Sequence, residues 1–512
     1  MKRLILLILL LLLSALSLVS CGGEKPEFIF EEIDGEVYIK DYRGDGGVVE
    51  VPREIDGKRV VGIGDMAFAN TPKLREVKMS GGTKIGKYAF ANCNNLEKIT
   101  VNDKALTLSE GAFYGCVSLK SVDASYAFEI PAYCFYNCSS LSEVTLGESL
   151  KKIGERAFLG CSSIKEIKLP SCLISLGERA FFDCTSLTDL QFGGSLSEVG
   201  EYCFAGVPSK LNMSMENLQR LAKNTFSGYS GEGIVLPDYD LKHADAEAFF
   251  DCSADVKMGR SEFLRLPEGF FAGYKGSKID LTEFCGDIGS GAFGGVESLI
   301  VLGEGMPDAI GERAFADYKG AHITIPKNVT SIGKNAFSGA ECSVTFADGS
   351  AIAVIGEYAF SEWLGNSIRL PDSVFEIGAY AFYSCDGIAE LPLGNGLRII
   401  GEGAFSGCLR ITEIDVPDSV VSIGSGAFSG MRYLRRVHIG DGATVLPEEI
   451  FAGCINFESI SIGESVTRIE ADAFMELSRP FELFYRGDKT AWDKVTVTGD
   501  GTLDYAEIVF EK

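Results

Sequence analysis

A short pattern, Ile-Gly-x-x-Ala-Phe, recurs with small variations along almost the whole chain of 512 residues. The intervals between its phenylalanines are always 22 or 23 residues. These phenylalanines are Phe68, Phe90, Phe113, Phe135, Phe158, Phe181, Phe204, Phe226, Phe249, Phe271, Phe293, Phe315, Phe337, Phe360, Phe382, Phe405, Phe428, Phe451 and Phe474. A unit this short cannot bury its own apolar face and must stack on its neighbours, so the period predicts a solenoid.

The unit from Leu141 to Cys161 shows the parts of one coil. Residues 141–146 end in alternating apolar and polar positions, which predicts a half-buried strand stacked in parallel with its copies. Residues 150–154 predict a second, shorter extended edge, and Ala157-Phe158 predicts a short helical or irregular turn with the ring filling the space between coils. The glycine ending the second edge is expected to supply a positive-φ turn. It recurs as Gly64, Gly86, Gly154, Gly177, Gly311, Gly356 and Gly401.

The fold class expected is therefore a mainly β solenoid with one short parallel strand per repeat, capped at both ends. A repeat array grows along one axis, so the chain is expected to form one elongated domain despite its length. Residues 1–21 are expected to be a signal peptide, 22–62 a short tether and N-terminal β cap, 63–480 a solenoid of about nineteen units, and 481–512 a C-terminal cap. Within the solenoid, the units between Val207 and Asp308 depart from the pattern.

The N-terminus has the features of a secretion signal. Basic residues Lys2 and Arg3 precede an apolar stretch too short to span a bilayer, and small residues follow it. Leu18-Val19-Ser20-Cys21 resembles the lipobox of bacterial lipoproteins, which implies that Cys21 carries the lipid and becomes the mature N-terminus. The alternative is an ordinary cleavage site with a chance cysteine. Either reading predicts export.

Three residues after the repeated phenylalanine, the chain often has a cysteine. The other occupants of this position are almost all apolar, so it is expected to point inward, with cysteine acting as a small buried hydrophobe. A disulfide between adjacent coils is the alternative, because neighbouring parallel strands lie within the Cα separation of a disulfide. Metal binding is the weakest reading, since no Cys-x-x-Cys pair occurs. The cysteines are Cys93, Cys116, Cys138, Cys161, Cys184, Cys252, Cys385, Cys408 and Cys454.

The repeated unit, Ile-Gly-x-x-Ala-Phe-x-x-Cys-x-x-Leu-x-x-Ile-x-Leu-Pro, resembles the BspA-like leucine-rich repeat of bacterial surface proteins. The resemblance covers roughly residues 40–500 and rests on a motif that is repeated many times. It implies a right-handed leucine-rich-repeat superhelix of the α/β type with a parallel sheet on one face, usually exported, and some members of the family are adhesins. The resemblance brings no catalytic residues with it.

Composition and residue spacing argue against several classes of function. The formal net charge is −25, so nucleic acid and anionic lipid headgroups are poor partners. The three histidines, His243, His322 and His438, are far apart in the coil count, and no phosphate-binding loop occurs, so no metal or cofactor is expected. Carboxylates are plentiful enough for a glycosidase. However, one glutamate recurs three residues before the phenylalanine, as Glu155, Glu178, Glu201, Glu312, Glu357 and Glu402, which favours a solvated or capping role over catalysis.

A binding surface is expected on the outward positions of the strands, because solenoids bind through variable polar residues between constant apolar ones. These positions are Thr100, Asp123, Thr145, Lys168, Gln191, Thr324, Arg369, Asp415, His438 and Ser461. Two tripeptides of the kind that integrins recognise also occur, Arg43-Gly44-Asp45 and Arg486-Gly487-Asp488. Both fall in the expected caps, where Gly-Asp turns are structurally favoured.

These observations favour a surface protein that mediates adhesion, not an enzyme. It is expected to be exported, to be a monomer, and to touch the membrane through its lipid anchor only. Its partner would be a protein or glycan, with host extracellular matrix among the candidates, because a long face of varied polar groups suits such ligands better than a small molecule. The alternative is a structural envelope lipoprotein without a specific ligand.

Overall fold

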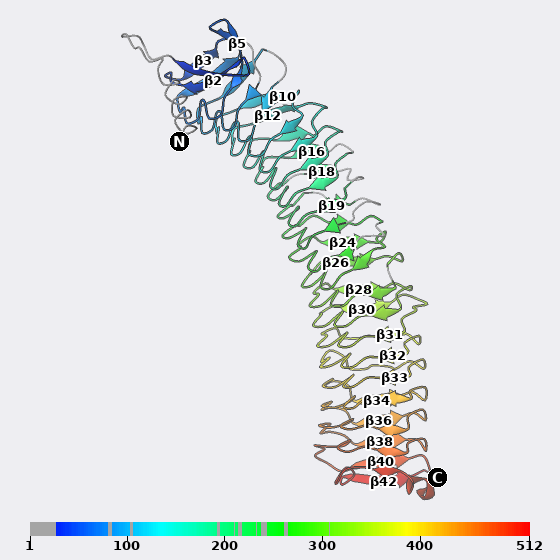
Figure 1. The fold of residues 1–512 in the computed structure, drawn as a ribbon. Coiled ribbons are helices and arrows are strands. Elements are labelled where there is room, and N and C mark those ends of the chain that lie inside the picture. The colour runs from blue at the N-terminus through cyan, green and yellow to red at the C-terminus, as the bar shows by residue number, and fades with distance from the viewer. Residues whose placement is uncertain are drawn as a thin grey trace, which may run out of the picture.

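The structure is a computed structural model that describes residues 27–79, 84–102, 106–191, 195–208, 210–212, 218–231, 233–236, 243–260, 265–306 and 308–511. The chain forms a long, gently curved rod of stacked coils, with the described N-terminal and C-terminal segments at opposite ends (Figure 1). The predicted solenoid is confirmed. Residues 1–21, including Cys21, lie outside the described residues.

One parallel ladder runs along a face of the rod, with about one strand in each coil (Figure 1). We call this surface the strand face. Its strands fall into several separately paired sheets. They are β3 (Gly47–Val51), β6 (Leu74–Met79), β8 (Lys98–Val101), β10 (Ser121–Ala124), β12 (Glu143–Leu146), β14 (Glu166–Lys168), β16 (Asp189–Gln191), β18 (Lys210–Asn212), β20 (Ile234–Val235), β22 (Val256–Lys257), β24 (Lys278–Leu281), β26 (Leu299–Leu302), β28 (His322–Ile325), β30 (Ser343–Phe346), β34 (Glu413–Val416), β36 (Arg436–Ile439), β38 (Ser459–Ile462), β40 (Phe481–Tyr485) and β42 (Ala506–Phe510).

A second parallel ladder corresponds to the shorter extended edge expected from the sequence. Apart from β5, its strands are two residues long in every coil. They are β5 (Lys58–Ile63), β7 (Lys84–Ile85), β9 (Thr107–Leu108), β11 (Glu129–Ile130), β13 (Lys152–Ile153), β15 (Ser175–Leu176), β17 (Glu198–Val199), β19 (Arg220–Leu221), β21 (His243–Ala244), β23 (Arg265–Leu266), β25 (Asp287–Ile288), β27 (Ala309–Ile310), β29 (Ser331–Ile332), β31 (Val354–Ile355), β32 (Glu376–Ile377), β33 (Ile399–Ile400), β35 (Ser422–Ile423), β37 (Val445–Leu446), β39 (Arg468–Ile469) and β41 (Thr496–Val497).

The two ends of the rod extend these ladders. At the N-terminal end, β1 (Phe28–Ile33) forms an antiparallel hairpin with β2 (Glu36–Tyr42), which pairs in parallel with β5, and β4 (Glu54–Ile55) pairs with β5. At the C-terminal end, β40 and β42 continue the strand face and β41 continues the second ladder. The short helix α2 (Lys489–Trp492) lies between β40 and β41 in the chain and is the one helix in the described part of the protein.

The repeated phenylalanines form the centre of the core. All nineteen are at most 4% exposed. Each ring stacks on the next, with centroid distances from 5.0 Å for Phe315 and Phe337 to 6.2 Å for Phe181 and Phe204. The Ala-Phe segment forms an irregular turn, and its backbone bonds join coils, as from the Phe405 N–H to the Ala427 carbonyl (2.8 Å). Each ring is thus held by burial, worth about 1.5–3 kcal/mol, and by its place in the stack.

The prediction that the glycine after the second edge adopts positive φ is wrong. None of Gly64, Gly86, Gly154, Gly177, Gly311, Gly356 and Gly401 is among the positive-φ residues. These glycines are needed because the coils approach closely there: a Cβ on Gly154 would lie 2.5 Å from the Ala132 backbone nitrogen of the preceding coil. The positive-φ positions flank the phenylalanine instead, two residues before it and two after it, as at Arg156 and Gly160 around Phe158.

The cysteines after the phenylalanine point inward, as predicted. All cysteines of the described residues are free, and those of this position are buried. The sequence did not reveal that the thiol also serves as a donor. Cys161 Sγ donates to the Phe135 carbonyl of the preceding coil (3.1 Å), and Cys184 Sγ makes the same contact with Phe158 (3.2 Å). A small residue with a weak donor therefore fits this site better than a purely apolar one.

Candidate binding face

The strand face holds the outward positions chosen from the sequence. Thr100, Asp123, Thr145, Lys168, Thr324, Asp415, His438 and Ser461 lie on face strands and are exposed or half-exposed, whereas Arg369 is exposed but belongs to no strand. Gln191 lies on β16, and its side chain is outside the described residues. Strand register aligns several of them in one row: Asp123 with Thr145, Lys168 with Gln191, and Asp415 with His438 and Ser461.

Register also shows residues of the same row that the sequence analysis missed. Lys78 aligns with Thr100, Thr345 with Thr324, and Phe484 with Ser461. A second outward row runs two residues earlier, where Glu413, Arg436 and Ser459 align. Counting two residues back from each predicted position would have found this row, because successive side chains on one side of a strand are two residues apart.

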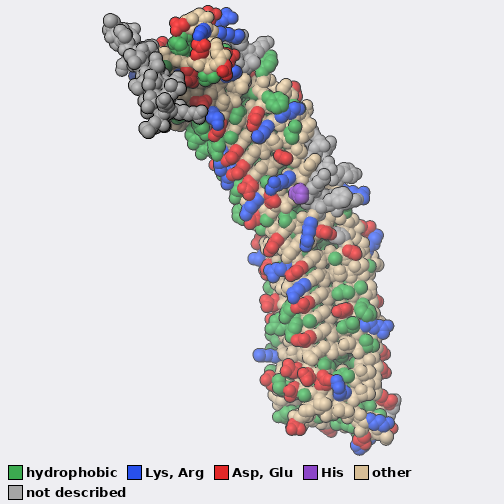
Figure 2. Space-filling model, in the orientation of Figure 1, with side chains coloured by type: hydrophobic (Ala, Val, Ile, Leu, Met, Phe, Trp, Pro, Cys, Tyr) green, Lys and Arg blue, Asp and Glu red, His purple; other side chains and the backbone are tan. Residues whose placement is uncertain are grey.

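Some charged side chains on the face strands or directly before them pair with a side chain of the neighbouring coil. Lys120 Nζ lies 2.6 Å from Glu97, Arg435 contacts Glu458 at 3.1 Å, and Arg436 contacts Glu413. Figure 2 shows acidic and basic side chains interspersed along the rod, without a continuous basic patch on the side in view. Exposed pairs of this kind contribute about 0–1 kcal/mol each, so they add little to the stability of the fold.

The histidines lie on three separate strands, β21, β28 and β36. His322 is part of a polar network on the strand face, with Nδ1 2.8 Å from Ser343 Oγ and Nε2 2.9 Å from Thr324 Oγ1. His438 Nε2 lies 2.9 Å from an Arg486 guanidinium nitrogen. Within the described ranges, no three His, Cys, Asp or Glu side chains come close enough together to hold a metal ion.

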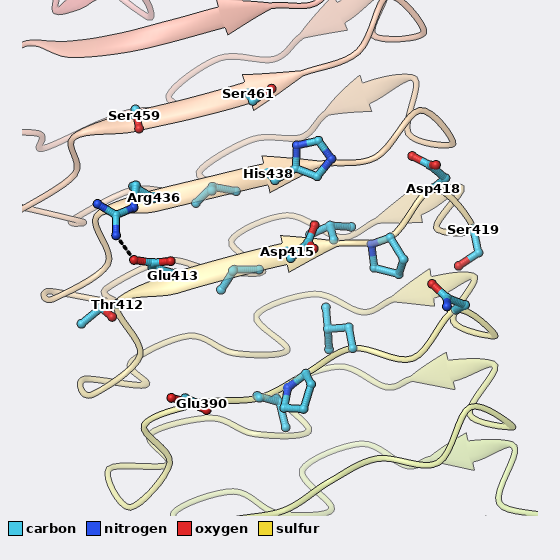
Figure 3. Close-up of a pocket in the computed structure, with 18 of the residues that line it drawn as sticks. Glu390, Thr412, Glu413, Asp415, Asp418, Ser419, Arg436, His438, Ser459 and Ser461 are labelled. Carbon is cyan, nitrogen blue, oxygen red and sulfur yellow. Dashed lines mark hydrogen bonds and ion pairs between the residues drawn. The ribbon is translucent and has the colours of Figure 1, made fainter.

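A hollow of about 1190 Å³ opens on the strand face near its C-terminal end (Figure 3). We call it the C-terminal hollow. Glu390 lies at one side of it, and Asp415, Asp418 and His438 lie at the other (Figure 3). Its lining comprises residues 389–393, Asn395, residues 412–419, Arg436, Val437, His438, Ser459, Ser461 and Phe484.

The glutamates that recur before the phenylalanine lie on the turns, away from the residues that line the C-terminal hollow. Several of them contact the neighbouring coils there. Tyr133 donates its hydroxyl to Glu155 (2.8 Å), Arg156 lies 3.3 Å from Glu178, and Tyr380 donates to Glu402 (2.6 Å). These contacts join side chains of neighbouring coils, and the solvated or capping role expected from the repetition stays a prediction.

The two integrin-type tripeptides occupy different environments. The first follows β2, where the Arg43 guanidinium donates to Asp41 (2.9 Å) and the Asp45 side chain is exposed. In the second, Arg486 donates to the Ile439 carbonyl (2.8 Å) and to Asp441 (2.7 Å), so the guanidinium is held against β36 and its following turn.

The aspartate of the second tripeptide is also engaged. Asp488 caps α2 by accepting a hydrogen bond from the Ala491 N–H (2.8 Å). Both charged side chains of this tripeptide therefore make internal contacts. Such contacts are expected for a structural turn, which was the alternative to recognition by integrins.

The repeat itself matches a known family. The BspA type leucine rich repeat region, in 6 copies, matches residues 61–129, 128–255, 264–363 and 353–479, which together contain all nineteen repeated phenylalanines. No curated protein is similar enough to the chain to count as a match. No helix of the described residues is long and apolar enough to cross a membrane.

Solved structures of similar proteins come from several bacteria. A leucine rich cell surface protein from Faecalibacterium prausnitzii is 19% identical over 94% of this chain and 98% of its own, with a TM-score of 0.28. A leucine-rich repeat protein from Bacteroides ovatus is 19% identical over 96% of this chain and 100% of its own, with a TM-score of 0.30. A leucine rich repeat protein from T. pallidum is 23% identical over 45% of this chain and 89% of its own, with a TM-score of 0.25.

Proposed function

Because the chain belongs to the BspA-type leucine-rich-repeat family, we propose that it is a cell-surface binding protein whose strand face holds a protein or glycan ligand. The observation that carries this proposal is the contrast between the two sides of each face strand. The inward residues are apolar in coil after coil, whereas the outward row changes from Asp123 to Thr145, and from Asp415 to His438 to Ser461. A long open surface of varied polar groups is how solenoids recognise large ligands.

The proposal includes export and a lipid anchor. Residues 1–21 would direct secretion, and Cys21 would carry the lipid and tether the rod to the membrane surface. Metabolic labelling with a radioactive fatty acid tests this step: the wild-type protein should be labelled, and the Cys21→Ala variant should not. Equal labelling of both would rule out Cys21 as the anchor.

The protein would act by binding, without a cofactor and without catalysis. The fold and family are those of repeat proteins, and the recurring glutamates make contacts between coils instead of facing a shared cleft. The first integrin-type tripeptide, Arg43-Gly44-Asp45, is a secondary candidate contact for host matrix receptors, because its Asp45 side chain is exposed.

Binding to immobilised extracellular-matrix proteins, mucin and cell-wall glycans tests the proposed function. The probe is the chain that starts at Gly22, which we call the leaderless chain. A face variant carrying Thr145→Arg and Thr324→Arg places two new charges on exposed positions of the strand face. The matched control carries Thr107→Arg and Ser422→Arg on exposed positions of the second ladder.

The proposal predicts saturable binding that the face variant weakens by at least about tenfold and the control leaves unchanged, because a misplaced charge in an interface costs several kcal/mol. Absence of saturable binding to every immobilised ligand would contradict the proposal and favour the alternative, a structural envelope lipoprotein. Equal losses in the two variants would place the binding surface elsewhere.

A further inference from the structure

The C-terminal hollow lies where the strand face is interrupted. Between β30 and β34, two successive coils contribute no face strand, at residues 366–370 and 388–393. All other coils in the described ranges between β6 and β38 contribute one. The second ladder continues without a break through β31, β32, β33 and β35, so these coils stay joined along their other edge. These two coils therefore lack ladder pairing on the strand face but keep it in the second ladder.

Pro392 provides a physical reason for the interruption. It stands 23 residues before Asp415, at the outward position of its coil, and it has no N–H to donate to a ladder. In the coils that follow, the Arg435 N–H donates to the Thr412 carbonyl (2.8 Å) and the Glu458 N–H donates to the Arg435 carbonyl (2.8 Å). Among the described residues, no bond of this kind joins Thr412 to Ala389.

Both sides of this interruption line the C-terminal hollow. The edge of β34 that faces residues 389–393 has no described strand beside it, and an unpaired strand edge is a template for another extended chain. The position of the hollow thus coincides with the free edge of the sheet β34-β36-β38-β40-β42.

The charged groups around the hollow are unequal in sign. Four carboxylates line it, and one of them, Glu413, is paired with Arg436. Glu390, Asp415 and Asp418 have no ion-pair partner among the described residues, although Asp418 accepts a hydrogen bond from the Asp441 N–H (2.8 Å). Besides these carboxylates and Arg436, the lining contains one more ionisable side chain, His438, which lies beside Arg486.

Apolar groups complete the surface of the hollow. Leu391, Pro392 and Leu393 lie on one side of the interruption, and Phe484, on β40, lies on the other. Leu391 and Leu393 are half-buried and pack on the core. A ligand that fills the hollow therefore meets apolar groups between unpaired carboxylates.

We propose that the C-terminal hollow binds an extended peptide segment rich in lysine or arginine. This proposal rests on the proposed function and specifies a ligand class for one part of the strand face. Three unpaired carboxylates select for basic side chains, and the free edge of β34 favours an extended main chain, as in other peptides that bind beside a sheet edge. The hollow exceeds the roughly 300–1000 Å³ of a pocket for a small molecule, which also favours a polymer segment.

Fluorescence anisotropy with three labelled octapeptides tests the ligand class. The probes alternate threonine with lysine, with glutamate, or with glutamine, so they differ in charge and share their length. The lysine peptide should bind the leaderless chain saturably, and the other two should bind at least tenfold more weakly. Added salt should weaken the binding, because the hollow is open to solvent.

Two triple variants locate the binding. The hollow variant carries Glu390→Gln, Asp415→Asn and Asp418→Asn. The control carries Glu449→Gln, Asp472→Asn and Glu476→Gln, which remove the same charge from exposed turn positions in nearby coils. The hollow variant should bind the lysine peptide at least tenfold more weakly than the wild-type protein does. The control variant should bind it with an affinity within twofold of the wild-type value. Thermal unfolding of both variants shows whether they keep the fold.

The immobilised matrix proteins and glycans, assayed beside the peptides, separate the two proposals. If an immobilised ligand binds while the lysine peptide fails to bind or binds both triple variants equally, the peptide proposal is wrong and the function proposed for the strand face remains. If neither the immobilised ligands nor any peptide binds, both proposals are wrong. Equal binding of all three peptides would overturn the assignment of a basic ligand.

Discussion

The thiol of Cys161 lies 3.1 Å from the carbonyl oxygen of Phe135 in the preceding coil and donates a hydrogen bond to it. The same carbonyl accepts the N–H of Cys138 within its own coil (3.1 Å). Each repeated phenylalanine of this part of the chain is therefore joined to its own turn by an amide and to the next turn by a thiol. This relationship explains why cysteine, among small residues, recurs at this position.

Cys161→Ala is expected to destabilise the protein by about 1–2 kcal/mol, because it removes a buried hydrogen bond and leaves a small cavity. The midpoint of urea unfolding measures the change. The half-exposed Cys285 is the control, and its replacement by alanine should change the free energy of unfolding by less than about 0.5 kcal/mol. Equal effects would mean that the thiol of Cys161 has no structural role.

Alkaline pH is expected to destabilise the fold through the buried thiols. Burial raises the pKa of Cys93 to about 11 and the pKa values of Cys184 and Cys454 to about 12. An unfolded cysteine ionises near pH 8.5, so above that pH the folded chain holds more protons than the unfolded chain. The stability from each thiol is fully present below about pH 8.5 and falls by up to about 1.4 kcal/mol per pH unit as the pH rises towards 11–12.

Thermal unfolding at a series of pH values from about 8 to about 10.5 checks this expectation. The Tm should fall steadily across the series. A Cys184→Val variant, which keeps an apolar side chain at the site, should show a shallower fall. A constant Tm for the wild-type protein would contradict the protonated state of the buried thiols.

Phe405→Ala is expected to destabilise the protein by about 3–5 kcal/mol, because the ring is 1% exposed and stacks on Phe382 at 5.5 Å and Phe428 at 5.6 Å. Phe405→Leu should cost less, since it keeps much of the apolar volume. Chemical denaturation of both variants gives the comparison. A cost below about 0.5 kcal/mol for the alanine variant would mean that the ring is not part of the core.

Gly401→Ala is expected to cost more than about 2 kcal/mol, because the new Cβ would lie 2.5 Å from the backbone nitrogen of Ala379 in the preceding coil. Gly295→Ala is the matched comparison. Gly295 has φ +69° and open space around it, so alanine there should cost only the backbone strain, about 1 kcal/mol. A larger cost at Gly295 than at Gly401 would contradict the close approach of the coils.

The sequence predicted the stack of coils well, because each coil repeats the same packing problem. The phenylalanine period predicted the core column, and the alternation around Val144 predicted a strand that the structure pairs in register with β10. The recurring glycine before each turn was recognised from the sequence. The reason that glycine is needed there, close approach between coils, was not. Close approach between coils depends on their spacing, which a single repeat does not reveal.

The candidate site was predicted in part. The outward row containing Asp415 and His438 followed from the two-residue period of a strand. The C-terminal hollow did not, because it arises where Pro392 replaces an outward polar residue and the ladder is lost over two coils. Only comparison of neighbouring coils in space shows that residues 389–393 and β34 lie on opposite sides of one opening (Figure 3).

The strand face and its hollow exist only if the chain forms a rod of about nineteen stacked coils. Small-angle X-ray scattering of the leaderless chain measures this directly. Coil spacings of about 5 Å predict a rod of about 90–100 Å and a radius of gyration of roughly 28–30 Å, compared with about 23 Å for a compact globule of this length. A measured radius close to the rod value would confirm the stack of coils, and one close to the globule value would contradict it.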